Sequence, residues 1–96
     1  MLKEKVMGKL LELQHGSNVA YVGLAYPGTE YHEYFLNTDL GVDPQAKLDE
    51  IRAFVRDAIY DIENNDVSNV DLFKYQSKIE EYLTLFPIKQ DEKGLR

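Results

Sequence analysis

The sequence contains no cysteine, and this absence removes several kinds of chemistry at once. Disulfide bonds, thiolate metal sites and thiol nucleophiles all require that side chain. A chain that folds without disulfides suits a reducing compartment. We therefore expect a cytoplasmic protein.

Histidine is scarce as well, since the chain has only His15 and His32. The two are not at a helical ligand spacing, and no HExxH motif is present. The glycine-rich frames GxxxxGK and GxGxxG, which bind nucleotide phosphates, are also missing. These absences predict no metal site, no cofactor and no enzymatic activity.

Long hydrophobic runs and an excess of basic residues are lacking too. Charged residues interrupt the opening MLKEKVMGKLLELQHG, so we expect neither a signal peptide nor a membrane-spanning helix. Seventeen acidic residues against eleven basic ones give a net charge of −6. Such a charge repels a phosphate backbone and attracts basic surfaces. The sequence predicts a protein partner with a basic surface, no direct nucleic-acid binding and no membrane contact.

What is present is an ordinary globular composition, with 44% hydrophobic and 29% charged residues in a chain of 96. A chain of this length folds as one domain with a modest core. We expect a single compact domain over residues 1–88. Residues 89–96, which follow Pro87 and are mostly polar, are predicted to form a frayed tail.

Hydrophobic periodicity predicts three helices. The first covers residues 2–14 and ends at Gly16, because glycine, serine and asparagine favour a turn in HGSN. The second runs from Pro44 to about Glu63, with Asp43 as its N-cap and an Asp49–Arg52 ion pair on its surface. The third begins after a cap at Ser68 or Asn69. Its apolar seam comprises Leu72, Tyr75, Ile79, Tyr82 and Phe86.

Between the first two helices, the residue types favour a β-hairpin. Residues 19–26 are rich in β-branched and aromatic side chains, and residues 29–37 would form the second strand. Pro27 and Gly28 suit a type II turn. The predicted fold is therefore α+β: an N-terminal helix, a β-hairpin, then two long antiparallel helices. In the alternative, a small all-α helical bundle, Thr29 caps a short helix with Tyr31 and Tyr34 on one face.

Tyr21, Tyr26, Tyr31 and Tyr34 fall within fourteen residues, and tyrosine is enriched at protein interfaces. We interpret the chain as a non-catalytic protein-interaction module that regulates or inhibits a larger partner through this aromatic hairpin. The competing interpretations are that the rings cap the protein's own core, or that His32 acts as a general base. The predicted partner-binding residues are Tyr26, Glu30, Tyr31, His32, Glu33 and Tyr34.

The sequence also offers two further candidate surfaces. Carboxylates on and after the second helix could imitate spaced phosphates, which would make the chain a decoy for a nucleic-acid-binding protein. The decoy residues would be Asp49, Asp57, Asp61, Glu63 and Asp66. The seam of the third helix could instead support a homodimer, although packing within the monomer is the favoured interpretation. The self-association residues would be Tyr75, Ile79, Tyr82 and Phe86.

Overall fold

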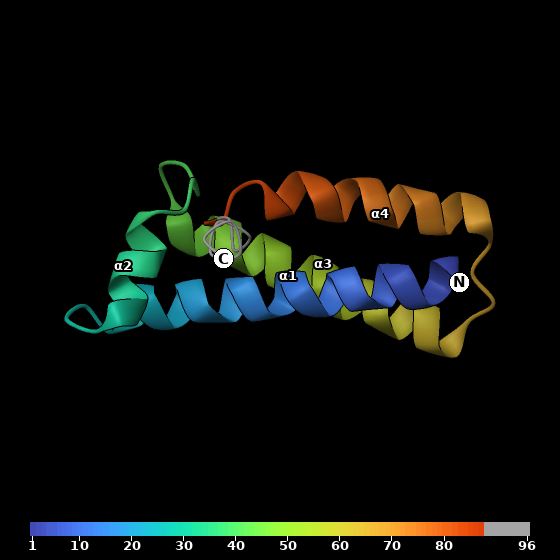
Figure 1. Ribbon diagram of the computed structural model, residues 1–96, viewed down its shortest axis with the longest axis horizontal. Helices are drawn as coiled ribbons and strands as arrows, with labels where there is room; N and C mark the ends of the chain where they lie inside the picture. The colour runs from blue at the N-terminus through green and yellow to red at the C-terminus, as the bar shows by residue number, and fades with distance from the viewer. Residues whose placement is uncertain (88–96) are drawn as a thin grey trace, which may run out of the picture.

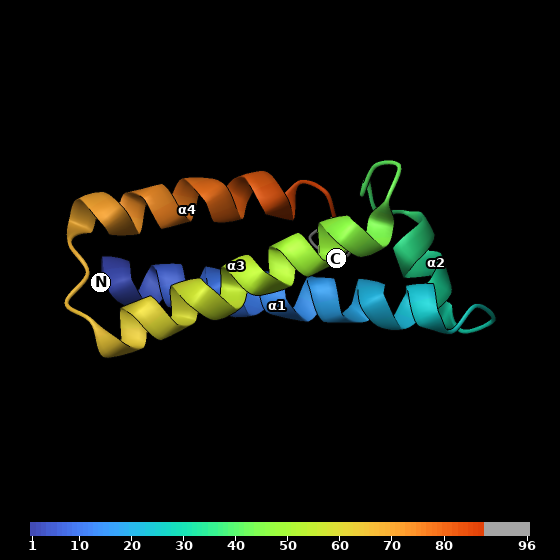
Figure 2. The ribbon, with the colours of Figure 1, turned by 180° about the vertical axis from the view of Figure 1, so that it is seen from behind.

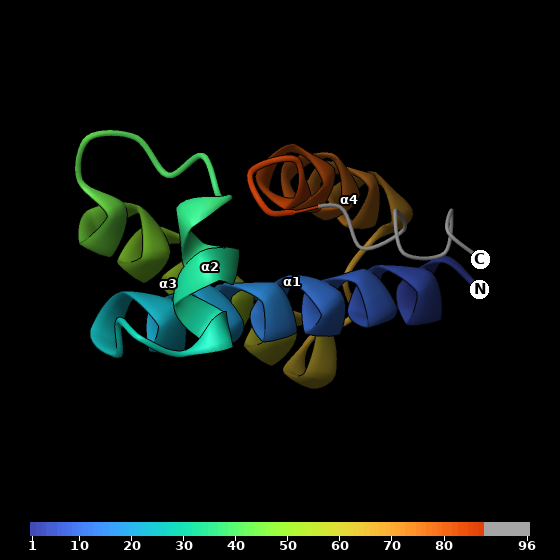
Figure 3. The same ribbon diagram turned by 60° about the vertical axis from the view of Figure 1, so that its left-hand side comes forward.

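The computed structural model describes residues 1–87, which form four helices and contain no strand (Figure 1). The helices are α1 (Leu2–Ala25), α2 (Glu30–Leu36), α3 (Pro44–Asn64) and α4 (Asn69–Leu83). The long helices α1, α3 and α4 run along the molecule, and short α2 crosses α1 near its C-terminal end (Figures 1 and 3). Figure 2 shows the α3 side, where α3 runs obliquely across α1. The tail predicted for residues 89–96 lies outside the described residues.

The predicted α+β fold is wrong, because α1 continues through HGSN to Ala25 instead of giving way to a strand. Gly16 and Ser17 are buried in the middle of this helix. The Ser17 hydroxyl donates a hydrogen bond to the Gln14 carbonyl oxygen at 3.0 Å, so it does not need a turn to find a partner. Gly16 lies against Tyr34 and Phe86. Tertiary packing has overridden the local preference for a turn and a strand.

The second half of the predicted hairpin is α2, as in the all-helical alternative. Gly28 has a φ of +105°, the left-handed backbone predicted for it, but its turn joins two helices instead of two strands. Thr29 is the residue before α2, and its hydroxyl donates to the Tyr26 carbonyl oxygen at 3.0 Å instead of capping α2. The molecule is a small helical bundle.

The other two helices begin where the sequence predicts. Asp43 caps α3 by accepting a hydrogen bond from the Ala46 amide at 3.2 Å, and Pro44 is the first helical residue. Ser68 caps α4 by accepting from the Asp71 amide, also at 3.2 Å. Helix α4 ends before Phe86, whose ring is nevertheless buried in the core.

All three other helices pack on α1, which is therefore the central element of the bundle. The core between α1, α3 and α4 is filled by aliphatic side chains. Its fully buried large members are Val6, Leu10, Leu13, Leu48, Ile51, Val55, Ile62 and Ile79. Helix α2 buries none of its own residues completely, so its position depends on how closely it can approach α1.

That approach occurs at Gly23, where the two backbones touch. A Cβ atom on Gly23 would stand 1.9 Å from the Tyr31 carbonyl oxygen and 2.8 Å from the Phe35 Cβ. Neither contact can be relieved by a side-chain rotation, because one atom belongs to the backbone and the other is fixed to it. Only glycine at this position lets α2 lie where it does.

We predict that Gly23→Ala lowers the free energy of unfolding by about 2 kcal/mol, because the new methyl group overpacks the α1–α2 contact. Gly8→Ala is the matched control in the same helix, since no atom lies within 4 Å of a Cβ at Gly8. That control should gain up to about 1 kcal/mol from the better helix propensity of alanine. Urea unfolding followed by circular dichroism measures both. An equal gain in stability from both substitutions would contradict the close contact at Gly23.

Candidate functional site

Four of the six residues predicted to bind a partner are exposed at the end of the molecule formed by the α1–α2 turn and α2. Tyr26 is 62% exposed and Tyr31 is 43% exposed. Glu30 and Glu33 are exposed on α2, in its first turn. We call these four residues the tyrosine end. It presents two aromatic rings beside two carboxylates.

The other two predicted residues, His32 and Tyr34, are turned toward α1. His32 Nδ1 lies 3.0 Å from the Gly23 carbonyl oxygen. In a continuing helix that oxygen would accept from the residue four positions later, but this residue is Pro27, which has no N–H. With its proton on Nδ1, His32 supplies the missing donor. Its role here is to close the C-terminal end of α1 and attach α2 to it.

Tyr34 is half-buried against Gly16 of α1. Its hydroxyl oxygen lies 3.3 Å from the point where a Cβ would stand on that glycine. Burial raises the pKa of Tyr34 above its usual value, because a phenolate would lose hydration there. Tyr34 therefore contributes a neutral ring to the α1–α2 contact and leaves the exposed contact area to Tyr26 and Tyr31.

The tyrosine end does not bring acid and base groups together. One ring nitrogen of His32 is directed at the Gly23 carbonyl oxygen, whereas Glu30 and Glu33 are exposed. Within residues 1–87, no group of three or more histidine, aspartate or glutamate side chains is placed to hold a metal ion. What the arrangement offers a ligand is aromatic contact area and negative charge.

The four predicted self-association residues pack within the monomer. Ile79 is fully buried, Tyr82 and Phe86 are 5% exposed, and Tyr75 is partly buried. The Tyr82 hydroxyl donates to Glu50 Oε2 at 2.5 Å, and the Tyr75 hydroxyl donates to Asp61 Oδ2 at 2.7 Å. The seam is occupied by α3 and α1, as the favoured interpretation expected. A homodimer through these residues stays a prediction, and it would require α4 to leave α3.

These two hydrogen bonds change the acidity of all four groups. The bond from Tyr82 lowers the pKa of Glu50, and the bond from Tyr75 lowers the pKa of Asp61. Burial, followed by the bond to Asp61, raises the pKa of Tyr75 to about 12. The pKa of Tyr82 is raised for the same reasons, with Glu50 as its partner. Neutral tyrosines thus face charged carboxylates at ordinary pH, and α4 is held to α3 by two charge-assisted bonds.

The carboxylates proposed as a decoy are partly engaged in local contacts. Asp61 accepts from Tyr75 and, at 2.8 Å, from Asn65. Asp57 accepts from Arg56 Nε at 3.2 Å. Glu63 and Asp66 are exposed. The decoy function stays a prediction, with its acidic groups less freely presented than the sequence suggested.

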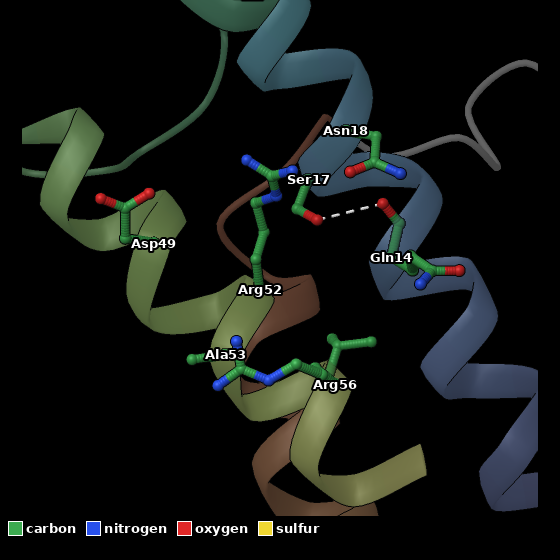
Figure 4. Close-up of a pocket in the computed structure, with 8 residues that line it drawn as sticks. Gln14, Ser17, Asn18, Asp49, Arg52, Ala53 and Arg56 are labelled. Carbon is green, nitrogen blue, oxygen red and sulfur yellow. Dashed lines mark hydrogen bonds between the residues drawn. The ribbon is translucent and has the colours of Figure 1, made fainter. Parts of the chain in front are cut away.

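A groove between α1 and α3 was missed by the sequence analysis (Figure 4). It has a volume of about 530 Å³. The expected ion pair between Asp49 and Arg52 is absent within residues 1–87. Asp49 instead accepts a hydrogen bond from Gln45. The Arg52 guanidinium lies over the Tyr21 ring, 4.7 Å from the ring centroid. The available signal was the spacing of Arg52 and Arg56, one helical turn apart in an acidic chain. The polar residues of the groove are Gln14, Ser17, Asn18, Asp49, Arg52 and Arg56.

Comparisons with family models, with curated proteins and with solved structures found no match to this chain. None of the helices within residues 1–87 has the length and apolar character that crossing a membrane requires.

We predict that Tyr82→Phe lowers the free energy of unfolding by about 1 kcal/mol near neutral pH, because the ring stays in place and only the bond to Glu50 is lost. This value is at the low end for a charged acceptor, since the Glu50 side chain is 49% exposed. Tyr60→Phe is the matched control, because Tyr60 is 67% exposed. Urea unfolding across pH measures both variants.

The difference between Tyr82→Phe and the wild type should depend on pH with a definite sign. The pKa of Glu50 is lower in the folded state, so its contribution is present above the ordinary value of 4.5 and lost as pH falls through the folded pKa. The pKa of Tyr82 is raised, so its contribution is present below the ordinary value of 10.0 and lost as pH rises through the folded pKa. A difference that stays constant from neutral to strongly acidic pH would contradict the charged bond.

Proposed function

We propose that this chain is a non-catalytic module that binds and regulates or inhibits a larger protein through its tyrosine end. The observation that carries the proposal is the exposure of Tyr26 and Tyr31 beside Glu30 and Glu33 on a closely packed support. Tyrosine offers a large, stiff contact surface with a polar tip, which is why it is enriched at interfaces.

The alternative is that the tyrosines of this segment cap the protein's own core. Only some of them do so. Tyr34 does pack against α1, and His32 closes the end of that helix. Tyr26 and Tyr31 keep 62% and 43% of their surface in water. Aromatic surface left in water can be buried by another molecule, and that burial favours association.

Charge supports a partner with a basic surface. The chain has no lysine or arginine from residue 10 to residue 46, a stretch that includes the whole tyrosine end. Glu30, Glu33 and Asp39 in this stretch are exposed. A concentration of one sign of charge steers a partner of the opposite sign and speeds its association.

The support beneath the tyrosine end is held by several contacts. Helix α2 meets α1 at Gly23, and His32 reaches the Gly23 carbonyl oxygen. The segment after α2 is attached to the end of α4, because the Asp39 amide donates to the Leu85 carbonyl oxygen at 2.8 Å. A surface fixed before binding loses less conformational entropy when the partner arrives, which favours affinity.

We predict that Tyr26→Ala and Tyr31→Ala each weaken partner binding at least about tenfold, which is the range of a hot-spot residue. The measurement is quantitative capture from lysate of the cells that encode the chain, at low and at moderate salt. Tyr60→Ala is the matched control, because Tyr60 is as exposed as Tyr26 but belongs to α3.

The control should retain the partner, and all three variants should unfold at the same urea concentration as the wild type. If the Tyr60→Ala variant lost the partner to the same extent, the proposal that the tyrosine end is the binding surface would be wrong. Binding that disappears between low and moderate salt, while the tyrosine substitutions have no effect, would favour the acidic decoy instead.

A further inference from the structure

The groove between α1 and α3 is lined by Arg52, whose charge is not neutralised by a carboxylate of the described residues. Arg52 could pair with Asp49 one turn earlier on the same helix, yet its side chain reaches across toward Ser17 on α1 (Figure 4). It makes no salt bridge within residues 1–87. One face of its guanidinium lies over the Tyr21 ring, 4.7 Å from the ring centroid, while its N–H groups have no carboxylate partner within residues 1–87 and can donate to a ligand.

Arg56 lies one turn further along α3 and also lines the groove, with its guanidinium turned back over α3 toward Ala53 (Figure 4). It gives its Nε proton to Asp57 at 3.2 Å, a bond that does not use the terminal nitrogens of the guanidinium. The pair with Asp57 is exposed and is therefore a weak competitor for a carboxylate bound in the groove. Two guanidinium groups thus line α3 at positions i and i+4.

The opposite wall repeats the same spacing with neutral groups. Gln14 and Asn18 stand four residues apart on α1 and both residues line the groove, although the Gln14 amide points away from α3 (Figure 4). Each amide offers one acceptor and two donors, which is the hydrogen-bonding capacity of a peptide unit. Ser17 lies between them and is fully buried, with its hydroxyl directed to the Gln14 carbonyl oxygen. The α3 wall therefore supplies groups that bind carboxylates, and the α1 wall supplies the Asn18 amide, which can bind peptide groups.

We propose that this groove is a binding site for an extended acidic peptide segment of a protein partner, with carboxylates on alternate residues held by Arg52 and Arg56. Positions i and i+4 of a helix are separated by about 6 Å along its axis. Alternate side chains of an extended chain point to the same side and are separated by about 6.7 Å. The two repeats agree closely enough for two successive carboxylates to meet two successive arginines.

The composition of the groove distinguishes this ligand from a nucleic acid. Asp49 lies at the Arg52 end of the groove and would face any third anionic group in line (Figure 4). A phosphate backbone continues with one charge per nucleotide, whereas a peptide can carry carboxylates at only the two positions that meet the arginines. A short peptide can place two carboxylates on the arginines and a backbone N–H at Asp49. Arginine also favours carboxylates by binding them through two parallel hydrogen bonds.

The groove and the tyrosine end share no residue, and they require ligands of opposite charge. The tyrosine end is acidic and would recognise a basic surface, whereas the groove would recognise an acidic segment. Removing the Tyr26 ring should therefore leave the groove's affinity unchanged. This difference allows each proposal to fail without the other.

The test is fluorescence anisotropy of a labelled hexapeptide with glutamate at its second and fourth positions and serine elsewhere, titrated with the full chain. The Arg52→Ala and Arg56→Ala variants should each bind at least about tenfold more weakly, the loss that corresponds to one charged pair. Arg52→Lys keeps the charge but not the two parallel bonds, so it should lie between wild type and Arg52→Ala. Lys74→Ala, an exposed position on α4, is the charge-matched control and should bind like the wild type.

Three comparisons make the outcome decisive. A hexapeptide of the same composition with its two glutamates adjacent should bind more weakly, and equal affinity for both peptides would overturn the spacing argument. Free glutarate should compete poorly, and displacement at the same concentration as the peptide would identify a small dicarboxylate as the ligand instead. Absence of binding to the wild type, or an Arg52→Ala variant that folds and binds normally, would overturn the site itself.

Discussion

The contact between the α1 and α2 backbones at Gly23 is the constraint on which the position of α2 and the tyrosine end depends. Helix α2 is seven residues long, and such a helix is not stable by itself in water. Its position is set by the close approach at Gly23, by His32 on the Gly23 carbonyl oxygen and by Tyr34 against Gly16. Each glycine weakens α1 by about 1 kcal/mol relative to alanine. The packing that these glycines permit offsets that cost and places Tyr26 and Tyr31 in water.

The same residue type serves two purposes in different parts of the bundle. On α4, the rings of Tyr75 and Tyr82 contact Phe54, and their hydroxyls reach carboxylates of α3. These hydroxyls had suggested an interface, but both find their hydrogen-bond acceptors within the monomer. At the tyrosine end, Tyr26 and Tyr31 remain largely exposed. The sequence spacing of the tyrosines does not distinguish the two uses, because the distinction lies in what the neighbouring helices present.

Sequence reasoning succeeded where the deciding interactions are local. The caps at Asp43 and Ser68 each contact an amide three residues away, so residue type and position were enough to place the starts of α3 and α4. The prediction of a hairpin was wrong because glycine can have two different effects on a helix. Read locally, Gly16 and Gly23 weaken a helix, whereas in the bundle they are the points where Tyr34, Phe86 and the α2 backbone come close. That information belongs to pairs of distant residues.

At the candidate site, too, local features could be predicted from the sequence and contacts between distant residues could not. Tyr26, Glu30, Tyr31 and Glu33 are exposed, and their role in partner binding stays a prediction. The inward position of His32 depends on α1 reaching Pro27, which leaves the Gly23 carbonyl oxygen without an N–H donor. Once α1 is known to continue, the need for a donor follows from the sequence. The prediction of an Asp49–Arg52 ion pair was wrong because the Arg52 guanidinium packs on the ring of Tyr21. Tyr21 is on another helix, so the local sequence does not reveal this contact.

The two proposed surfaces have opposite charge requirements, and this has a consequence for affinity. A partner with a basic patch and an acidic segment would engage the tyrosine end and the Arg52–Arg56 groove together. Once one contact forms, the other becomes intramolecular and benefits from a raised effective concentration. Each contact can then be weak by itself, which suits a chain of 96 residues that has little surface to spare for a single large interface. Binding would also be selective, because a partner with only one sign of charge would lose the second contact.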